Sequence, residues 1–402
     1  MKKTAKRILS LALMLTLSLA MLLPACAAEA NAADIQASAL KQLRLFKGVD
    51  GNFELNRALT RTEALIMLIR TLGKESEAVN GSFKHPFTDV MSWADKYIGY
   101  AYEKGLTKGV SATKLGSGNA DSDMYLTFML RALGYSDAAG DFAWDAPDAL
   151  AASVGILPSG VDTADFLRAD AVLVSWAALE ARVKDGSQTL SQKLMDMKVL
   201  YSEEYESAKL FVQKDGGTAV STFAELQTAL NNKDVTAIQI GSDMDIPGEF
   251  LIDRENGPET LIYIKEGVTV TVSGELIALG CFFTNDGAMA ITGTFDRGLN
   301  SLTNNGTITV KSGGTFCSGM TDTYNYGAVT VDNGGKLLVE RGTQFYNYGN
   351  IGNDGYISVD NGGCLFNDAG KIANSGTIDL ASYFEGDLSV ITGTGTINDK
   401  RQ

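Results

Sequence analysis

Glycine recurs at nearly constant intervals in the second half of this 402-residue chain, each time just before a short segment of alternating apolar and polar residues. The first three intervals are 20, 19 and 21 residues. Alternation with period two is typical of half-buried strands, and a repeat of several short strands is typical of a parallel solenoid in which each repeat forms one rung. We therefore predict a parallel β-solenoid within residues 221–402. The ladder glycines are Gly267, Gly287, Gly306, Gly327, Gly349 or Gly355, Gly376 and Gly395.

Asparagine marks many of the predicted turns, as in Asn285-Asp286-Gly287 and Asn304-Asn305-Gly306. An amide side chain repeated on stacked rungs can hydrogen-bond to its neighbours, so we predict asparagine ladders inside the turns. Glycine supplies the left-handed backbone conformations that such turns need. The region resembles the right-handed parallel β-helices of surface proteins and polysaccharide lyases.

A T-x-x-E capping box at Thr222 and Glu225 precedes the solenoid and predicts a helix over Phe223–Leu230. We expect this helix to cover the open edge of the first rung. Residues 201–220 are charged, rich in glutamate and contain a Gly-Gly pair, so we expect them to form a linker.

The solenoid sequence offers little for catalysis, because its basic residues are few and scattered. We therefore predict a non-enzymatic role, with a wall-anchored polysaccharide lyase or glycosidase, or a glycan-binding adhesin, as the alternatives. Clustered acidic and basic side chains on one face would favour the enzyme. No cofactor is expected, although Asp332 and Asp360 occupy equivalent turns that could bind Ca²⁺ weakly. Four tyrosines recur one rung apart, and they could either stack on one another structurally or contact glycans. They are Tyr324, Tyr326, Tyr346 and Tyr348.

The N-terminus has the pattern of a secretory signal peptide, which we place at residues 1–32. Four basic residues precede an apolar run over residues 8–23, and small residues follow. The run is shorter than the roughly 20 residues that a membrane span needs, and no later segment is long and apolar enough. An alternative is lipid attachment at Cys26. We expect an exported protein without an integral membrane span.

The charged residues argue against a nucleic-acid partner, because 34 Lys and Arg stand against 48 Asp and Glu, for a net charge of −14. His85 is the single histidine, so neither a Ser-His-Asp triad nor a multi-histidine zinc site can be built. After signal removal three cysteines remain, Cys281, Cys317 and Cys364, which we interpret as packing residues, with one disulfide and a leftover thiol as the alternative.

Residues 33–200 contain a second, helical repeat. The segment 60–73 matches the segment 121–134, 61 residues later, and both end in Leu-Gly, a helix followed by a glycine stop. A third copy begins at Leu167. We therefore predict three helical units, over about 34–80, 83–140 and 141–200.

This part resembles the S-layer homology family of bacterial surface proteins. The matching segments are Phe87-Thr88-Asp89-Val90, Trp93-Ala94, Gly105-Leu106-Thr107-Lys108-Gly109, and Thr60-Arg61-Thr62-Glu63, echoed by Leu167-Arg168-Ala169-Asp170. The resemblance implies a multidomain α + β protein: an all-α pseudo-threefold bundle followed by the solenoid. It also implies non-covalent binding to a secondary cell-wall polysaccharide, often one that carries pyruvate ketals, a location at the cell wall, and self-association in a surface layer.

Eight residues are candidates for polysaccharide binding: Arg61, Glu63, Asp89, Trp93, Gly109, Trp144, Arg168 and Asp170. An arginine fork suits a pyruvyl carboxylate, indole rings stack on sugar faces, and the turn at Gly109 can offer backbone amides to an anion. Alternatives remain open. Glu63 and Asp89 could cap helices, and the two tryptophans could pack internally. The second unit has Ser122 where the others have arginine, so at most two of the three grooves are expected to bind a carboxylate.

Overall fold

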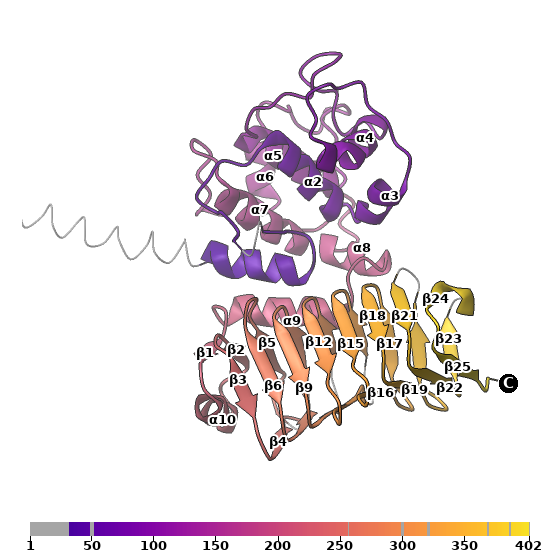
Figure 1. Cartoon of the computed structure of the whole chain (residues 1–402). Coiled ribbons are helices and arrows are strands. Elements are labelled where there is room, and N and C mark those ends of the chain that lie inside the picture. Colours follow the sequence, from indigo (N-terminus) through magenta and orange to yellow (C-terminus); the bar gives the residue numbers. More distant parts are fainter. Residues whose placement is uncertain are drawn as a thin grey trace, which may run out of the picture. The chain divides into compact units, whose positions relative to one another are not determined.

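The chain forms two compact units, Met1–Tyr201 and Ser202–Gln402 (Figure 1). The structure, a computed structural model, describes residues 32–48, 52–255, 257–298, 301–319, 322–367, 370–385 and 387–401. Cys26 and all but the last residue of the expected signal peptide lie outside the described residues. Within the described part of the chain, no helix has both the length and the hydropathy to cross a bilayer.

The second unit is a parallel β-solenoid of about eight turns, as predicted, in which every rung contributes a strand to each of three parallel sheets. The nine-stranded sheet contains β1 (Thr218–Val220), β2 (Ala237–Ile240), β5 (Thr260–Ile264), β8 (Cys281–Asn285), β11 (Leu302–Asn304), β14 (Thr323–Asn325), β17 (Gln344–Asn347), β20 (Cys364–Phe366) and β23 (Tyr383–Glu385).

The other two sheets have eight strands each. One contains β3 (Met244–Ile246), β6 (Thr269–Val272), β9 (Ala288–Ile291), β12 (Thr307–Val310), β15 (Ala328–Val331), β18 (Asn350–Asn353), β21 (Lys371–Asn374) and β24 (Ile391–Thr392). The other contains β4 (Glu249–Asp253), β7 (Glu275–Leu279), β10 (Thr294–Arg297), β13 (Thr315–Cys317), β16 (Lys336–Val339), β19 (Tyr356–Val359), β22 (Thr377–Leu380) and β25 (Thr396–Asp399). A short 3₁₀ helix, η2 (Leu388–Val390), precedes β24.

The glycine ladder forms two columns rather than one. Gly306 stacks on Gly287, and Gly327 on Gly306, closely enough that an added Cβ would meet the carbonyl oxygen below. Gly349 continues this column before β18, whereas Gly355 begins the approach to β19 in the next sheet. Gly349 and Gly355, which the repeat offers as alternatives, therefore both occupy turns of the solenoid, at two different corners of the rung.

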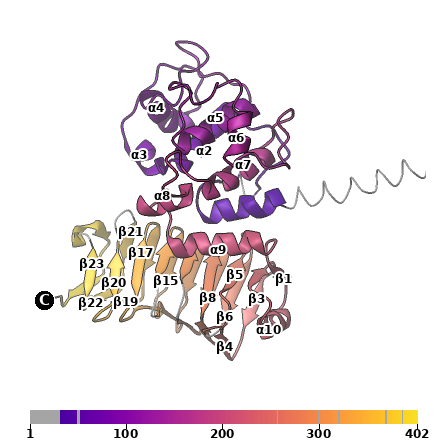
Figure 2. The same cartoon turned by 180° about the vertical axis from the view of Figure 1, so that it is seen from behind.

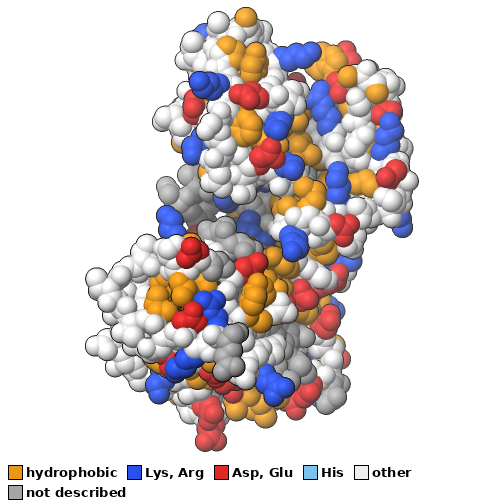
Figure 3. Space-filling model, turned by 90° about the vertical axis from the view of Figure 1, so that its right-hand side faces the viewer, with side chains coloured by type: hydrophobic (Ala, Val, Ile, Leu, Met, Phe, Trp, Pro, Cys, Tyr) orange, Lys and Arg blue, Asp and Glu red, His pale blue; other side chains and the backbone are white. Residues whose placement is uncertain are grey.

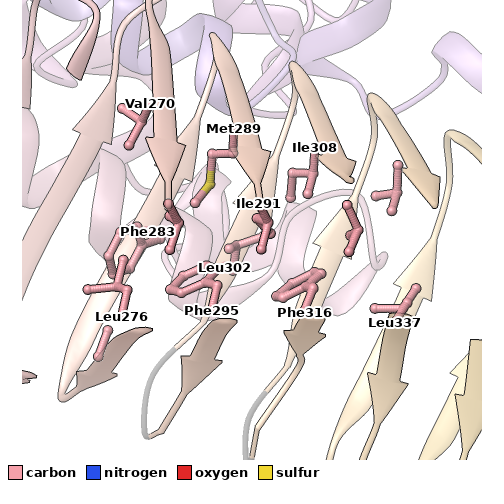
Figure 4. Close-up of a cluster of buried hydrophobic side chains, with 14 of the residues drawn as sticks. Val270, Leu276, Phe283, Met289, Ile291, Phe295, Leu302, Ile308, Phe316 and Leu337 are labelled. Atoms are coloured by element: carbon pink, nitrogen blue, oxygen red, sulfur yellow. The ribbon is translucent and has the colours of Figure 1, made fainter. Parts of the chain in front are cut away.

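The core of the solenoid is a stack of inward-pointing apolar side chains, one set per rung. Figure 4 shows Phe283, Phe295 and Phe316 pointing into this interior together with Met289, Ile308 and their neighbours. The rings of Phe295 and Phe316 are stacked, with centroids 5.6 Å apart and planes 8° from parallel. Burying apolar area in this way supplies the main favourable free energy of the unit.

Two helices cover the solenoid. Helix α10 (Phe223–Asn231), with Thr222 as its N-cap, contacts β1, β2 and β3 and buries Leu226 in the core, so it lies over the first rung as expected. Helix α9 (Ser202–Gln213) packs on β5 and β8, and Figures 1 and 2 show it lying across this sheet. The expected linker, residues 201–220, therefore contains a helix and the first strand of the solenoid unit.

The first unit is helical, as predicted. It contains a helix over residues 32–42, α2 (Arg61–Thr71), α3 (Glu75–Asn80), η1 (Ser92–Ala94), α4 (Asp95–Glu103), α5 (Ser122–Ala132), α6 (Asp148–Ser153), α7 (Arg168–Glu180) and α8 (Leu190–Asp196). Helices α2, α5 and α7 occupy the three repeated segments. Helix α5 packs on both α2 and α7, and the buried side chains of all three form the core of this unit.

Charged side chains of both signs are interspersed over the face shown in Figure 3. The net charge of −14 is therefore not gathered there into one broad acidic field.

Candidate binding pockets of the helical unit

One pocket of the helical unit, which we call the Arg61 pocket, has a volume of about 660 Å³. It lies between the first turn of α2, the turn that follows α4, and one face of α5. Three of the eight candidate residues, Arg61, Gly109 and Trp144, meet in it. The complete lining is Arg61, Gly105, Leu106, Thr107, Lys108, Gly109, Asp121, Met124, Thr127, Phe128, Arg131 and Trp144.

Arg61 is the first residue of α2, and its backbone N–H donates to the carbonyl of Gly118 at 3.1 Å. Its side-chain Nε is buried, yet no hydrogen-bond partner for it exists among the described residues. A buried donor without a partner costs about 1–3 kcal/mol. The guanidinium is therefore a donor that a ligand entering the pocket could satisfy.

The other charges of the pocket are arranged differently. Arg131 is paired with Asp137, to which its guanidinium donates two hydrogen bonds of 2.9 and 2.8 Å. Lys108 forms no ion pair within the described part of the chain. Asp121 is a carboxylate in the lining, but it caps α5 by accepting from the backbone N–H of Met124 at 2.9 Å. Arg61 and Lys108 are thus two cations of the lining that form no ion pair among the described residues.

Gly109 and Trp144 shape the pocket. Gly109 has a φ of +70°, and a Cβ there would meet the carbonyl oxygen of Lys114, so the turn requires glycine. The Trp144 side chain is exposed, and the backbone carbonyl of Trp144 accepts from Thr127 Oγ1 at 3.2 Å. An exposed indole beside a cationic wall suits a sugar ring that carries a carboxylate.

A second pocket, the Arg168 pocket, repeats this arrangement on the preceding helix at a smaller volume of about 180 Å³. It brings together Glu63, Trp93 and Arg168 of the candidate set. Four lining positions on α2 are matched 61 residues later by lining positions on α5: Glu63, Ile66, Met67 and Arg70 by Met124, Thr127, Phe128 and Arg131. The remaining lining residues are Phe46, Lys47, Gly48, Trp93 and Arg168.

Arg168 is engaged inside the protein, and only 2% of the residue is exposed. Its Nε donates to the carbonyl of Phe53 at 2.9 Å, one Nη donates to Glu63 at 2.9 Å, and the guanidinium lies over the ring of Phe46, 4.9 Å from its centroid. The arginines at equivalent positions of two repeats therefore differ: Arg61 has a free donor, while Arg168 is paired.

Glu63 is the centre of this ion-pair network. It closes the capping box with Thr60, as the sequence allowed, and also accepts from Arg57 at 2.6 and 2.9 Å. Burial raises the pKa of Glu63, but the hydrogen bonds from Arg57 and Thr60 and the charge of Arg168 outweigh it and lower the pKa to about 2. The carboxylate is therefore fully charged at neutral pH.

Asp89 and Asp170 do not line either of these two pockets, and their carboxylates accept hydrogen bonds from backbone amides. Asp89 accepts from the N–H groups of Leu115 and Gly116 at 2.9 and 3.0 Å. Asp170 accepts from Leu167 and Asp162, each at 2.8 Å, and burial raises its pKa. Both carboxylates hold turns in place. Trp93 is exposed at the rim of the Arg168 pocket.

Sequence reasoning named the turn at Gly109 but missed the side chain of Lys108 within it, and it missed Arg57 altogether. Lys108 could have been found from its place in that turn. Nothing in the spacing of Arg57 points to Glu63.

The tyrosines of the solenoid form ladders between rungs. Tyr324 stacks on Tyr346, with centroids 5.2 Å apart and planes 6° from parallel, and Tyr346 stacks on Phe366 at 4.7 Å. Tyr326 and Tyr348 are stacked in the same way. Because the rings face one another, their faces are used within the ladder, which favours the structural interpretation over a platform for sugars.

The described acids of the solenoid were candidates for a metal site or for acid–base chemistry. Burial, and then the charges of Asp296 and Asp360, raise the pKa of Glu340. No basic side chain joins them, because neither Glu340 nor Asp360 forms an ion pair among the described residues. Asp332 pairs with Lys311 at 3.1 Å. No group of three or more acids, cysteines or histidines in the described ranges is placed to hold a metal ion. Cys281, Cys317 and Cys364 are free thiols.

Comparison with known proteins found a family similar to part of the solenoid unit. Residues 217–337, from β1 to β16, match the family described as "Putative pectate lyase-like adhesive domain". No curated protein matches the chain. The match does not extend into the helical unit, so the resemblance of that unit to S-layer homology domains stays a prediction from the sequence.

Proposed function

We propose that this chain is an exported surface protein that binds an anionic cell-wall polysaccharide through its helical unit and displays the β-solenoid as a non-enzymatic adhesive domain. The observation that carries the proposal is the buried, unpartnered Nε of Arg61 in a pocket with Lys108 and Trp144. A carboxylate on a sugar, such as a pyruvate ketal, would satisfy the guanidinium while the ring stacks on the indole.

The adhesive role is supported by the description of the matching family. A lyase would need a base and a positive partner at one place on the solenoid. The aromatic ladders and asparagine ladders account for the recurring polar and aromatic residues without a ligand.

Co-sedimentation of the full chain with purified cell-wall sacculi tests the anchor. We expect binding that disappears when the secondary polysaccharide is stripped chemically. Arg61→Ala should weaken binding by at least about tenfold, which corresponds to about 1.4 kcal/mol, and Arg61→Lys should recover only part of it because the fork is lost.

Arg182→Ala is the matched control, since Arg182 is an exposed arginine of the same unit outside both pockets. Equal binding of the Arg61→Ala and Arg182→Ala proteins, or equal binding to stripped walls, would contradict the anchor.

The enzymatic alternative is tested with the same protein on polygalacturonate, by the ultraviolet absorbance of an unsaturated product. The adhesive role is tested by binding of the Arg61→Ala protein to immobilised glycans, because that variant separates solenoid binding from wall binding.

A further inference from the structure

The two pockets carry different side chains at the third residue of the helix that lines each of them. Glu63 is the third residue of α2 and lies beside Arg168, the first residue of α7. Met124 is the third residue of α5 and lines the pocket that contains Arg61, the first residue of α2. The same helix positions thus carry a carboxylate in one pocket and a thioether in the other.

This difference determines which arginine is available. In the Arg168 pocket every cationic side chain faces a carboxylate: Arg168 pairs with Glu63 at 2.9 Å, and Arg70 and Lys47 pair with Glu75 at 3.0 and 3.3 Å. In the Arg61 pocket Met124 carries no charge, Asp121 caps α5, and neither Arg61 nor Lys108 forms an ion pair with a described residue. An anion entering the Arg168 pocket would have to displace a carboxylate held by several hydrogen bonds.

We infer that the helical unit has one working anion pocket and that Glu63 closes the other, by supplying from within the chain the carboxylate that a ligand would bring to Arg168. The inference rests on the proposed function of the Arg61 pocket and goes beyond it, because it assigns the number of sites and the residue that sets it.

The volumes of the pockets fit this assignment, since the closed pocket is about 180 Å³ and the open one about 660 Å³. Trp93 remains exposed at the rim of the closed pocket, so the surface for a sugar ring persists there although the arginine is occupied.

Titration calorimetry of the full chain, with a monosaccharide that carries a 4,6-pyruvate ketal as the probe, tests the inference. The wild-type protein is expected to bind one equivalent, and Arg61→Ala none. Glu63→Gln keeps the shape of the side chain, removes its charge and leaves Arg168 facing the pocket, so we expect two equivalents. The double variant Glu63→Gln, Arg168→Ala should return to one.

Two bound equivalents in the wild-type protein would overturn the inference, and so would a folded Glu63→Gln protein that gains no site dependent on Arg168. These outcomes differ from failure of the proposed function, in which the wild-type protein shows no binding that depends on Arg61. The second site expected in the Glu63→Gln protein is measured by its dependence on Arg168, so it does not require binding at Arg61.

The reverse substitution covers the case in which Glu63→Gln does not fold, because Glu63 also caps α2. Met124→Glu puts a carboxylate at the equivalent helix position of the Arg61 pocket, where glutamate is favourable near a helix N-terminus. We expect it to weaken binding of the probe at least tenfold relative to Met124→Gln, which has the same size without the charge. Equal affinities of these two variants would overturn the inference.

Discussion

Asn304 donates its side-chain amide to the side-chain oxygen of Asn325, 2.7 Å away on the next rung of the solenoid. The ladder continues from Asn325 to Asn347 at 2.8 Å and on to Asn367 at 2.6 Å, and begins at Asn285. All five side chains are buried, so each rung depends on its neighbours to satisfy its amide.

Replacing a middle member of this ladder should therefore cost more than one hydrogen bond. Asn325→Ala removes the side-chain acceptor of the Asn304 amide, which keeps the backbone carbonyl of Ala328 at 3.2 Å, and leaves the side-chain oxygen of Asn347 without its donor. We expect a loss of about 3 kcal/mol in the free energy of unfolding. Denaturant unfolding measures it. The control is Asn350→Ala, at an exposed position of the same unit; equal unfolding midpoints of the two variants would refute the ladder's contribution.

The glycine column predicts that the same substitution, glycine to alanine, has different effects on stability at two positions of the solenoid. A Cβ at Gly327 would meet the carbonyl oxygen of Gly306, whereas a Cβ at Gly352 would meet nothing within 4 Å. We expect Gly327→Ala to destabilise the solenoid by about 2 kcal/mol and Gly352→Ala to stay within about 0.5 kcal/mol of the wild type. Thermal unfolding of both variants checks this, and a neutral Gly327→Ala would show that the column is not tightly packed.

Arg254 holds the covering helix on the first rung. It is buried and donates to the carbonyls of Leu230, Asn232 and Val235 at 2.8, 3.0 and 3.3 Å, at the end of α10. Arg254→Ala should loosen α10 and expose the first strands.

Hydrogen exchange should therefore accelerate in α10, β1 and β2 of the Arg254→Ala protein while the last rungs keep their protection. Arg341→Ala, at an exposed arginine further along the solenoid, is the control. Uniform acceleration along all rungs would argue against local capping.

The pH dependence of the helical unit follows from Glu63. Its pKa is about 2 in the folded chain against a usual 4.5, so its ion pairs stabilise the fold above the unfolded pKa and are lost as the pH falls toward 2. We expect the thermal midpoint of the helical unit to fall over this window. The Glu63→Gln protein should begin lower at neutral pH and change less, and parallel pH profiles of the two proteins would contradict the role of Glu63.

The solenoid was largely predictable because its pattern repeats in register. Strands β9, β12 and β15 each begin at the residue directly after a ladder glycine, namely Gly287, Gly306 and Gly327. Helix α9 was not predicted, because its charged residues hid a buried face. Tyr205, Ala208 and Phe211 recur at helical spacing and mark that face.

The candidate site was predictable only in part, for a physical reason. Arg61 and Arg168 begin equivalent helices, and their sequences suggest equal roles. What separates them is Glu63, which lies 105 residues before Arg168 in the chain and reaches it only in the fold. Spacing along the sequence shows which side chains share a helix face, but not which carboxylate arrives from another helix.

In the solenoid, asparagines and glycines stack on residues of their own type in the neighbouring rungs, and this affects how the number of rungs can change. Asn304, Asn325 and Asn347 each contact a residue of their own type above and below, as do Gly306 and Gly327. Duplicating or deleting one of these middle rungs would therefore leave the ladder amides and the column glycines with neighbours of the kind they already have. The length of the solenoid would then change in steps of one strand spacing, about 4.8 Å, without a new kind of turn.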